Sequence, residues 1–243
     1  MKIDILSVFP KMFDSVMNAS ILSKASEKGL LEINTVDIRD FTKDKHKKTD
    51  ETPFGGGAGM VMTVQPVFDA LKSVGAEKKR ILYMSPRGKM LDGKFAEELS
   101  REEALVFLCG HYEGIDERII EYWKPEEISI GDYILTGGEL AAMVVIDVMS
   151  RLIPDVLGNQ DSVKGESVYS GLLEYPQYTR PREYEGLEVP DVLLSGDHKA
   201  INLWKFEQAC ILTKNRRADL WENFLKRTDS LSKDERKIIE KLR

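Results

Sequence analysis

Two glycine-rich polar segments, each directly after a short apolar run, constrain the fold of this chain most. Cys109–Arg118 follows the apolar residues 105–108, and Ser129–Leu140 continues from the apolar run 128–130. Glycines at strand ends let the backbone approach a ligand, and ligands of open α/β sheets bind beyond the carboxyl ends of strands. The segments therefore predict one pocket. Two tight turns would also explain the glycines, but not the dense polar side chains of Tyr112, Glu113, Asp116, Asp132 and Tyr133.

The start of the chain is typical of a strand, helix, strand order. Residues 3–9 alternate and are rich in β-branched side chains, and Pro10 suits the first turn of a helix. A second helix should end at Gly29, where a left-handed cap is natural. The predicted elements are a strand at 3–9, helices at 10–18 and 20–28, and a strand at 31–38. This order opens a parallel α/β sheet.

The pattern continues with further strands and helices as far as residue 153. We predict helices at 64–74, 93–100, 115–123 and 138–153, and strands at 80–84, 105–108 and 128–130. Ser85–Gly88 then forms a third polar strand end. The helix at 138–153 is apolar almost all round, so it must be buried on every side, and a subunit interface is the simplest cover.

A long segment, Arg39–Thr63, shows no regular pattern. It contains a basic cluster at Lys43–Lys48 and a glycine run at Pro53–Met60. The glycines match neither the spacing of a Walker phosphate loop nor that of a dinucleotide fingerprint. A flexible lid or an RNA-contacting loop fits this segment better, and an ordered surface loop is the plainer alternative.

The pattern of alternating strands and helices ends at about Pro154. A polar, turn-rich stretch at 159–165 is typical of a linker, and Tyr175–Pro181 is aromatic, basic and proline-stiffened. Helices are predicted at 199–212, 217–226 and 230–242, the last beginning with cap-like residues at 230–235. The chain therefore has a second, mainly helical part.

Composition narrows the functional classes. The net charge of −6 argues against general coating of nucleic acid, but basic clusters at Lys43–Lys48, at Arg180 and Arg182, and at Lys214–Arg217 keep an anionic partner open. Each could also be a solvated face. The two cysteines have no zinc-binding spacing and indicate a reducing compartment. The amino terminus lacks a signal-peptide pattern and no apolar run could cross a bilayer, so we expect a cytoplasmic protein without membrane contact.

An ordered set of motifs resembles one family, the bacterial tRNA (guanine-N1)-methyltransferases of the TrmD family, in the SPOUT class. The matching stretches cover nearly the whole chain: Phe54–Met60, Tyr83–Pro86, Gly110–Arg118, Ser129–Glu139, Gly171–Leu173, Pro176–Pro181 and Val192–His198. The resemblance implies an α/β fold with a parallel sheet and a C-terminal trefoil knot. It also implies a SAM-binding methyltransferase domain at 1–158, a flexible linker at 159–173 and a small, mainly helical tRNA-binding domain at 174–243.

The same resemblance implies the chemistry. The enzyme would be a homodimer with its active site at the subunit interface, and the methyl donor would be S-adenosylmethionine (SAM). The substrate would be N1 of the guanosine immediately 3′ of the anticodon, position 37, in tRNA, and the second product S-adenosylhomocysteine. Magnesium dependence is a family property, although the sequence shows no protein-built metal site.

The resemblance also assigns site residues. The cofactor-binding set falls on the three polar strand ends found above: Tyr83, Met84, Ser85, Pro86, Gly110, Tyr112, Glu113, Ser129, Ile130, Gly131, Asp132, Tyr133, Ile134, Leu135, Gly137 and Gly138. Residues expected to bind RNA through stacking, charge or close backbone approach are Gly59, Tyr178, Arg180, Lys214, Arg216 and Arg217.

Family correspondence places the general base at Glu166 and a cation for guanine O6 at Arg151. Family members usually carry aspartate at the base position, so Glu166 is a departure that keeps the carboxylate. Glu174 and Asp161 are the reserve bases. From the residues alone, Glu166 would be a solvated linker carboxylate and Arg151 a surface arginine near a helix end. His111 is expected to orient backbone rather than to act as a base.

Two other functions stay open. A methyltransferase of the same fold could act on ribosomal RNA, although the Pro176–Pro181 segment and the helical C-terminal part disfavour it. A non-catalytic RNA-binding protein on a decayed scaffold is the second alternative. The intact glycines and the carboxylate at Glu166 argue against decay.

Overall fold

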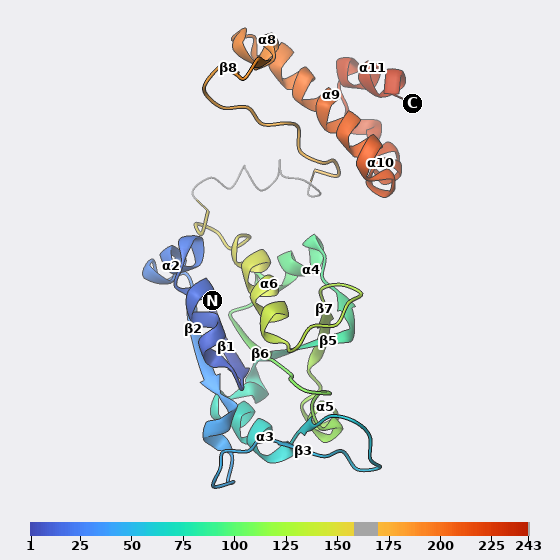
Figure 1. Cartoon of the computed structure of the whole chain (residues 1–243). Coiled ribbons are helices and arrows are strands. Elements are labelled where there is room, and N and C mark those ends of the chain that lie inside the picture. The colour runs from blue at the N-terminus through green and yellow to red at the C-terminus, as the bar shows by residue number, and fades with distance from the viewer. Residues whose placement is uncertain (158–169, 243) are drawn as a thin grey trace. The chain divides into compact units, whose positions relative to one another are not determined.

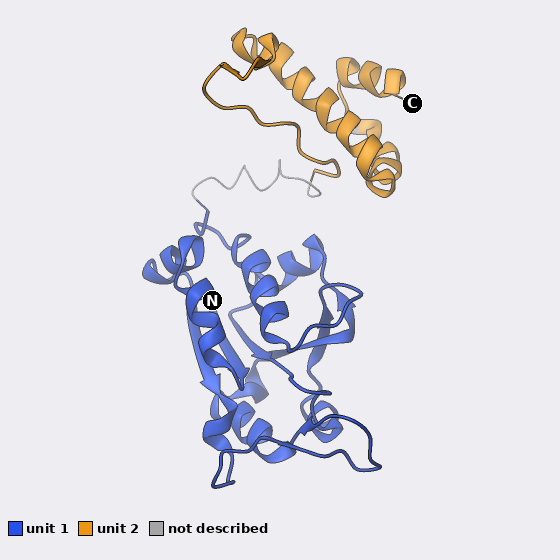
Figure 2. Ribbon diagram, in the orientation of Figure 1, with its two compact units in different colours: residues 1–158 blue, residues 159–243 orange. Residues whose placement is uncertain are grey.

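The structure, a computed structural model, describes residues 1–157 and 170–242 (Figure 1). The chain divides into two compact units, residues 1–158 and 159–243 (Figure 2). Each unit has its own hydrophobic core, so each is described by itself.

Unit 1 is built on a five-stranded sheet in the order β2-β1-β6-β5-β7, and every pairing in it is parallel. The predicted parallel α/β sheet is therefore confirmed. The strands are β1 (Lys2–Ser7), β2 (Glu32–Asp37), β5 (Arg80–Met90), β6 (Ala104–Leu108) and β7 (Glu126–Ser129). β1 and β6 are almost continuously buried, as expected of parallel strands covered on both faces.

Helices cover both faces of this sheet, and the alternation of side chains along the strands divides the core in two. Along β6, Leu105 and Phe107 enter one cluster, whereas Val106 and Leu108 enter the other. The helices of unit 1 are η1 (Pro10–Phe13), α1 (Asp14–Met17), α2 (Ser20–Glu27), η2 (Ile38–Phe41), α3 (Val64–Ser73), η3 (Ala76–Lys78), α4 (Gly93–Leu99), α5 (Glu117–Trp123) and α6 (Glu139–Ser150).

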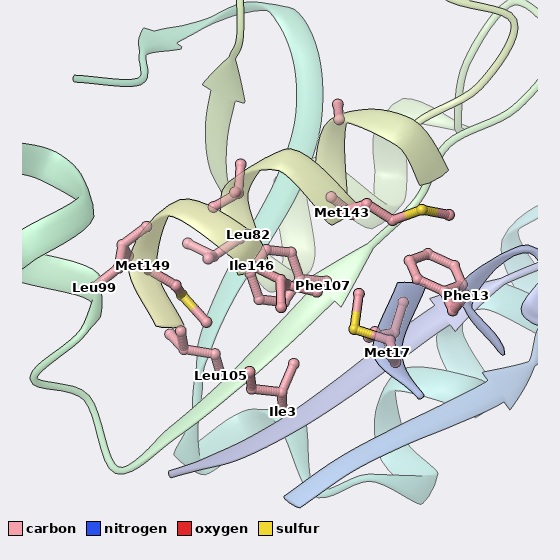
Figure 3. Close-up of a cluster of buried hydrophobic side chains, with 14 of the residues drawn as sticks. Ile3, Phe13, Met17, Leu82, Leu99, Leu105, Phe107, Met143, Ile146 and Met149 are labelled. Atoms are coloured by element: carbon pink, nitrogen blue, oxygen red, sulfur yellow. The ribbon is translucent and has the colours of Figure 1, made fainter. Parts of the chain in front are cut away.

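The first cluster packs η1, α1, α2, α4 and α6 against the sheet, and the second contains residues of α3 and α5. Figure 3 shows Met143, Ile146 and Met149 of α6 over the side chains of the strands. These α6 residues are at most 7% exposed. The apolar side of α6 is therefore fastened to the sheet.

Within the single chain, α6 is not buried on every side, so its predicted cover by a subunit interface stays a prediction. Leu140 and Val144 remain 48% and 42% exposed, and Asp147 lies on the same exposed side. Residues four apart on a helix share a face, so Leu140 and Val144 form an apolar stripe that unit 1 leaves uncovered. We call these two residues the α6 stripe.

Strand β5 differs from the prediction because it continues to Met90 instead of ending at Met84. Its pairing with β7 shifts register between Met84 and Lys89, so Ser85–Gly88 forms an irregularity within the strand rather than a loop after it. The polar segment is still displaced from regular pairing. The predicted loop at 39–63 is also interrupted, by a short antiparallel ladder of β3 (Asp50–Glu51) and β4 (Val61–Met62).

Unit 2 is mainly helical. Its core includes Leu172, Ala209, Cys210, Trp221 and Ile239. Its elements are β8 (Glu183–Tyr184), β9 (Leu187–Glu188), α8 (Asp191–Leu194), α9 (His198–Arg216), α10 (Ala218–Leu225), η4 (Thr228–Ser230) and α11 (Lys233–Leu242). Helix α9 extends beyond its predicted end at 212, and the β8–β9 hairpin was not predicted.

The last helix, α11, begins with a capping box. The backbone N–H of Ser232 donates to Glu235 Oε2 at 2.8 Å, and the N–H of Glu235 donates to Ser232 Oγ at 3.3 Å. Each residue thereby satisfies a backbone donor of the other, which fixes the start of the helix.

Candidate active site

A cavity of about 380 Å³ lies beside the register shift in the middle of β5 and at the carboxyl ends of β6 and β7. Three segments line it, 83–86 from β5, 110–114 after β6 and 128–138 after β7, together with Ala141 of α6. The third segment ends where α6 begins, at Glu139. This is the edge at which open parallel sheets bind ligands.

The cavity gathers every predicted cofactor residue except Asp132. The side chain of Asp132 is exposed at the outer part of the 128–138 segment and does not line the cavity. The lining also includes residues that the sequence analysis did not assign: His111, Gly114, Ile128, Thr136 and Ala141. All five lie within or directly beside the polar segments, so proximity to the motifs could have found them.

Tyr83 contributes a buried phenol to the lining of the cavity. It is 7% exposed, and this burial raises the pKa of its hydroxyl. The phenol therefore stays neutral and can both donate and accept hydrogen bonds. Gly110 packs on it so closely that a Cβ there would lie 2.9 Å from the ring carbon Cε2 of Tyr83. A larger residue at 110 would press on the phenol.

The 110–114 segment is a tight turn fastened to β4. Gly114 N–H donates to His111 O at 3.1 Å, and Tyr112 and Gly114 adopt positive φ angles of 59° and 131°. The N–H of Met62 donates to Gly114 O, and the N–H of Glu113 donates to Met60 O, both at 2.9 Å. The glycine run at 53–60 is therefore attached at its base to the pocket.

Gly59, predicted to contact RNA, lies against this same turn. A Cβ at Gly59 would come within 2.4 Å of Glu113 Cγ. At the other end of the run, Phe54 is fully exposed. The run therefore extends from the Glu113 side of the pocket toward solvent.

The third segment is held by its own hydrogen bonds and by one to the second segment. Ser129 Oγ donates to Gly131 O at 3.2 Å, and Tyr133 Oη donates to Ile130 O at 3.2 Å. Gly138 N–H donates to Gly110 O at 2.7 Å, which joins the second and third segments directly. This bond fixes the second and third segments against each other, and the apolar residues Ile130 and Leu135 are part of the lining.

The sequence profile of the family described as "tRNA (Guanine-1)-methyltransferase TrmD" matches residues 1–223. The chain belongs to this family. Over 224 residues it is 57% identical to the tRNA (guanine-N(1)-)-methyltransferase of Ruminiclostridium cellulolyticum, which covers 91% of this chain and 96% of the relative. The protein of the same name from Clostridium perfringens strain 13 is 52% identical over 240 residues, 98% of this chain and 99% of the relative. The resemblance drawn from the motifs is confirmed.

Arg151, one of the two predicted catalytic residues of this TrmD-family chain, does not line the cavity. Arg151 is the C-cap of α6, where its N–H donates to Asp147 O at 3.4 Å. At 1.5 Å per residue it lies roughly 20 Å along the helix from Gly138, at the end remote from the cavity. Glu166 and the reserve base Asp161 lie outside the described residues, and the other reserve, Glu174, lies in unit 2.

The remaining RNA-binding candidates of the TrmD-family chain lie in unit 2. Tyr178 and Arg180 are exposed on the extended segment before β8, whereas Lys214 and Arg216 are exposed near the end of α9. Arg217 is engaged by Asp219, with Nη2 2.6 Å from Oδ2. Its charge is therefore partly neutralised, which leaves Lys214 and Arg216 as the stronger candidates of this cluster.

Among the described residues, no group of three or more histidines, cysteines and carboxylates is placed to hold a metal ion. No helix in the described part of the TrmD-family chain is long and apolar enough to span a membrane.

Proposed function

We propose that the chain is a SAM-dependent methyltransferase that modifies N1 of the guanosine immediately 3′ of the anticodon, position 37, in tRNA. The observation that carries this proposal is the cavity beside β5 and at the ends of β6 and β7, lined by the motif segments of a TrmD-family chain. The expected cellular setting is the cytoplasm.

The residues around the cavity fit SAM. Its volume of about 380 Å³ is within the range of small-molecule sites. Gly110, Gly131 and Gly138 let a nucleoside approach the backbone of the second and third segments without a Cβ in the way, and Ile130 and Leu135 suit its apolar faces. Glu113 offers a carboxylate to a positively charged ligand. When bound, SAM supplies an electrophilic methyl group on a cationic sulfur.

The chain must then activate a poor nucleophile. Guanine N1 carries a proton at neutral pH, and a carboxylate within hydrogen-bond reach can remove it. We assign this role to Glu166. As the proton leaves, negative charge develops on guanine O6, and a guanidinium beside it lowers the barrier. We assign that role to Arg151.

Arg151 can serve the proposed site only if two copies of the chain combine. Within one chain it lies roughly 20 Å along α6 from Gly138, farther than an arginine side chain reaches. A homodimer that pairs the cavity of one protomer with Arg151 and Glu166 of the other removes this conflict. The α6 stripe, Leu140 and Val144, offers the apolar surface such a dimer would bury.

We also assign to unit 1 the trefoil knot of the SPOUT class. The hydrogen bond from Gly138 to Gly110, and the bridge between His111 and Gly137, support it. They bring the segment after β7 alongside the segment after β6, as threading of the chain end requires.

For the tRNA, we propose that the exposed basic residues contact phosphates and that Tyr178 offers a stacking surface. The target base must leave the stack of the anticodon loop, which costs less there than in a duplex. Magnesium, if the reaction needs it, would act with the RNA or the substrate rather than in a cage built by the described residues.

The proposal is tested with labelled SAM and three RNAs: tRNA with guanosine 3′ of the anticodon, the same tRNA with adenosine there, and ribosomal RNA. We expect N1-methylguanosine in the first RNA alone. Label in ribosomal RNA would support the alternative methyltransferase, and tRNA binding without any label would support the non-catalytic alternative.

The role of Glu166 is tested by Glu166→Gln, with Glu174→Gln as a matched carboxylate control. We expect Glu166→Gln to abolish turnover and keep SAM binding, whereas Glu174→Gln keeps both. Full activity of Glu166→Gln would move the general base to another carboxylate.

A further inference from the structure

A buried carboxylate lies behind the cavity and has no part in the proposed chemistry. Glu139, in the first turn of α6, is only 1% exposed. Its Oε1 accepts a hydrogen bond from Ser7 Oγ at 2.7 Å, and its Oε2 lies 3.7 Å from Nδ1 of His111. The three residues come from the end of β1, the turn after β6 and the start of α6.

Burial of a charged carboxylate costs free energy of folding unless other groups stabilise the charge. The hydroxyl of Ser7 and the amino-terminal end of α6 both favour a negative charge at Glu139. On its other side, the Nδ1 of His111 is itself buried and has no hydrogen-bond partner in the described part of the chain. His111 Nδ1 and Glu139 Oε2 face each other across 3.7 Å, so a small movement of either side chain would form a hydrogen bond between them.

The absence of a side chain at Gly137 lets His111 Nδ1 and Glu139 Oε2 approach each other. A Cβ on Gly137 would lie 2.3 Å from His111 Nδ1 and 2.4 Å from Glu139 Oε2, so a side chain at 137 would intrude between the two groups. The imidazole is also oriented by its neighbours, since its ring centre lies 4.8 Å from that of Phe9 and 5.1 Å from that of Tyr112.

We propose that His111 and Glu139 are positioning residues: a hydrogen bond from the imidazole Nδ1–H to the carboxylate holds the 110–114 turn against the start of α6. That contact sets the width of the cavity where SAM binds. The inference rests on the proposed function, because SAM is the ligand whose affinity reports on the cavity. Neither residue takes part in methyl transfer.

Two substitutions at His111 separate hydrogen bonding from packing. His111→Asn keeps a nitrogen donor near the position of Nδ1 but loses the ring, whereas His111→Phe keeps the ring against Phe9 and Tyr112 but loses the donor. If the hydrogen bond matters, His111→Phe weakens SAM binding about tenfold and His111→Asn much less. If only packing matters, the order is reversed.

Glu139→Gln supplies the other half of the test. It keeps an acceptor for Ser7 but removes the charge, and we expect it to weaken SAM binding about tenfold as well. Because both changes break one interaction, the double variant Glu139→Gln/His111→Phe should bind no worse than either single variant. The KM for SAM should rise in His111→Phe, in Glu139→Gln and in the double variant, while kcat at saturating SAM stays close to that of the wild type.

The control is Asp4→Asn in β1, which removes a second buried carboxylate. Asp4 Oδ2 lies 2.6 Å from Lys79 Nζ, and neither residue lines the cavity. It should lower the melting temperature without changing SAM affinity. Affinities come from calorimetry on the full-length protein, with melting curves for every variant. Tight binding by His111→Phe, or additive losses in the double variant, would overturn the positioning role alone. Absence of SAM binding by the wild type would overturn the proposed function and this role with it.

Discussion

The α6 stripe gives a prediction about assembly whose size follows from the structure. Leu140 and Val144 keep 48% and 42% of their surface exposed in the single chain. Full burial of such side chains is worth about 1.5–3 kcal/mol, so covering the remaining half contributes about 1 kcal/mol each. A two-fold dimer contains each residue twice. Leu140→Gln/Val144→Asn should therefore weaken the proposed dimer by about 4 kcal/mol, roughly a thousandfold in its dissociation constant.

Sedimentation equilibrium over a range of protein concentrations measures this constant. The matched control is Leu194→Gln in α8 of unit 2, because Leu194 is also 48% exposed but does not belong to the stripe. The control should dimerise like the wild type. A wild-type protein that stays monomeric at all concentrations, or an unchanged constant in the double variant, would refute the reasoning.

Three further outcomes are expected. Gly110→Ala places a Cβ 2.9 Å from the buried ring of Tyr83, so the ring or the 110–114 turn must shift. This shift should weaken SAM binding at least tenfold by calorimetry, and an unchanged affinity would contradict the close packing of Gly110 on Tyr83. Asp116 caps α5, and the hydrogen bonds that it accepts from the guanidinium of Arg118, its ion-pair partner at 2.8 Å, hold the pKa of that carboxyl below its usual range. Its contribution is present above the unfolded-state pKa and is lost as the pH falls through the lower folded-state pKa. Asp116→Ala should therefore destabilise the protein by about 1 kcal/mol at neutral pH in urea titrations, with a deficit that shrinks below about pH 4, and a constant deficit would argue against the ion pair. Arg151→Gln should lower kcat about a hundredfold with SAM affinity intact, whereas an unchanged kcat would remove Arg151 from the reaction.

Local patterns predicted most of unit 1 because its core obeys them. The alternation of apolar residues in β6 divides them between two faces, and Gly29, at φ 70°, ends α2 where a left-handed cap was expected. The exact course of β5 was not predictable in the same way. Pro86 and its polar neighbours are typical of a turn, and only pairing with β7 keeps the chain extended to Met90.

The β8–β9 hairpin had a local signal that the sequence analysis missed. Its two-residue turn, Glu185-Gly186, has φ angles of 50° and 78°, as a primed hairpin turn requires, and glycine at its second position favours that conformation. The flanking pairs are too short and too polar to show alternation. Strand propensity alone therefore could not identify them.

The candidate site shows the same division between local and long-range information. Glycines and polar residues after apolar runs indicated which segments meet at the cavity, since strand ends of a parallel sheet share one edge. The pairing of His111 with Glu139 depends on how the chain after β7 passes the turn after β6. No spacing in the sequence encodes that contact, so the sequence predicted a backbone-orienting role for His111 without indicating Glu139 as its partner.

The central claim is that three segments of one TrmD-family chain form the SAM site, and hydrogen–deuterium exchange with and without SAM tests it most directly. We predict that SAM slows exchange in peptides covering 83–86, 110–114 and 128–138, and leaves α9 and α11 unchanged. Protection confined to unit 2, or to residues away from these three segments, would contradict the account.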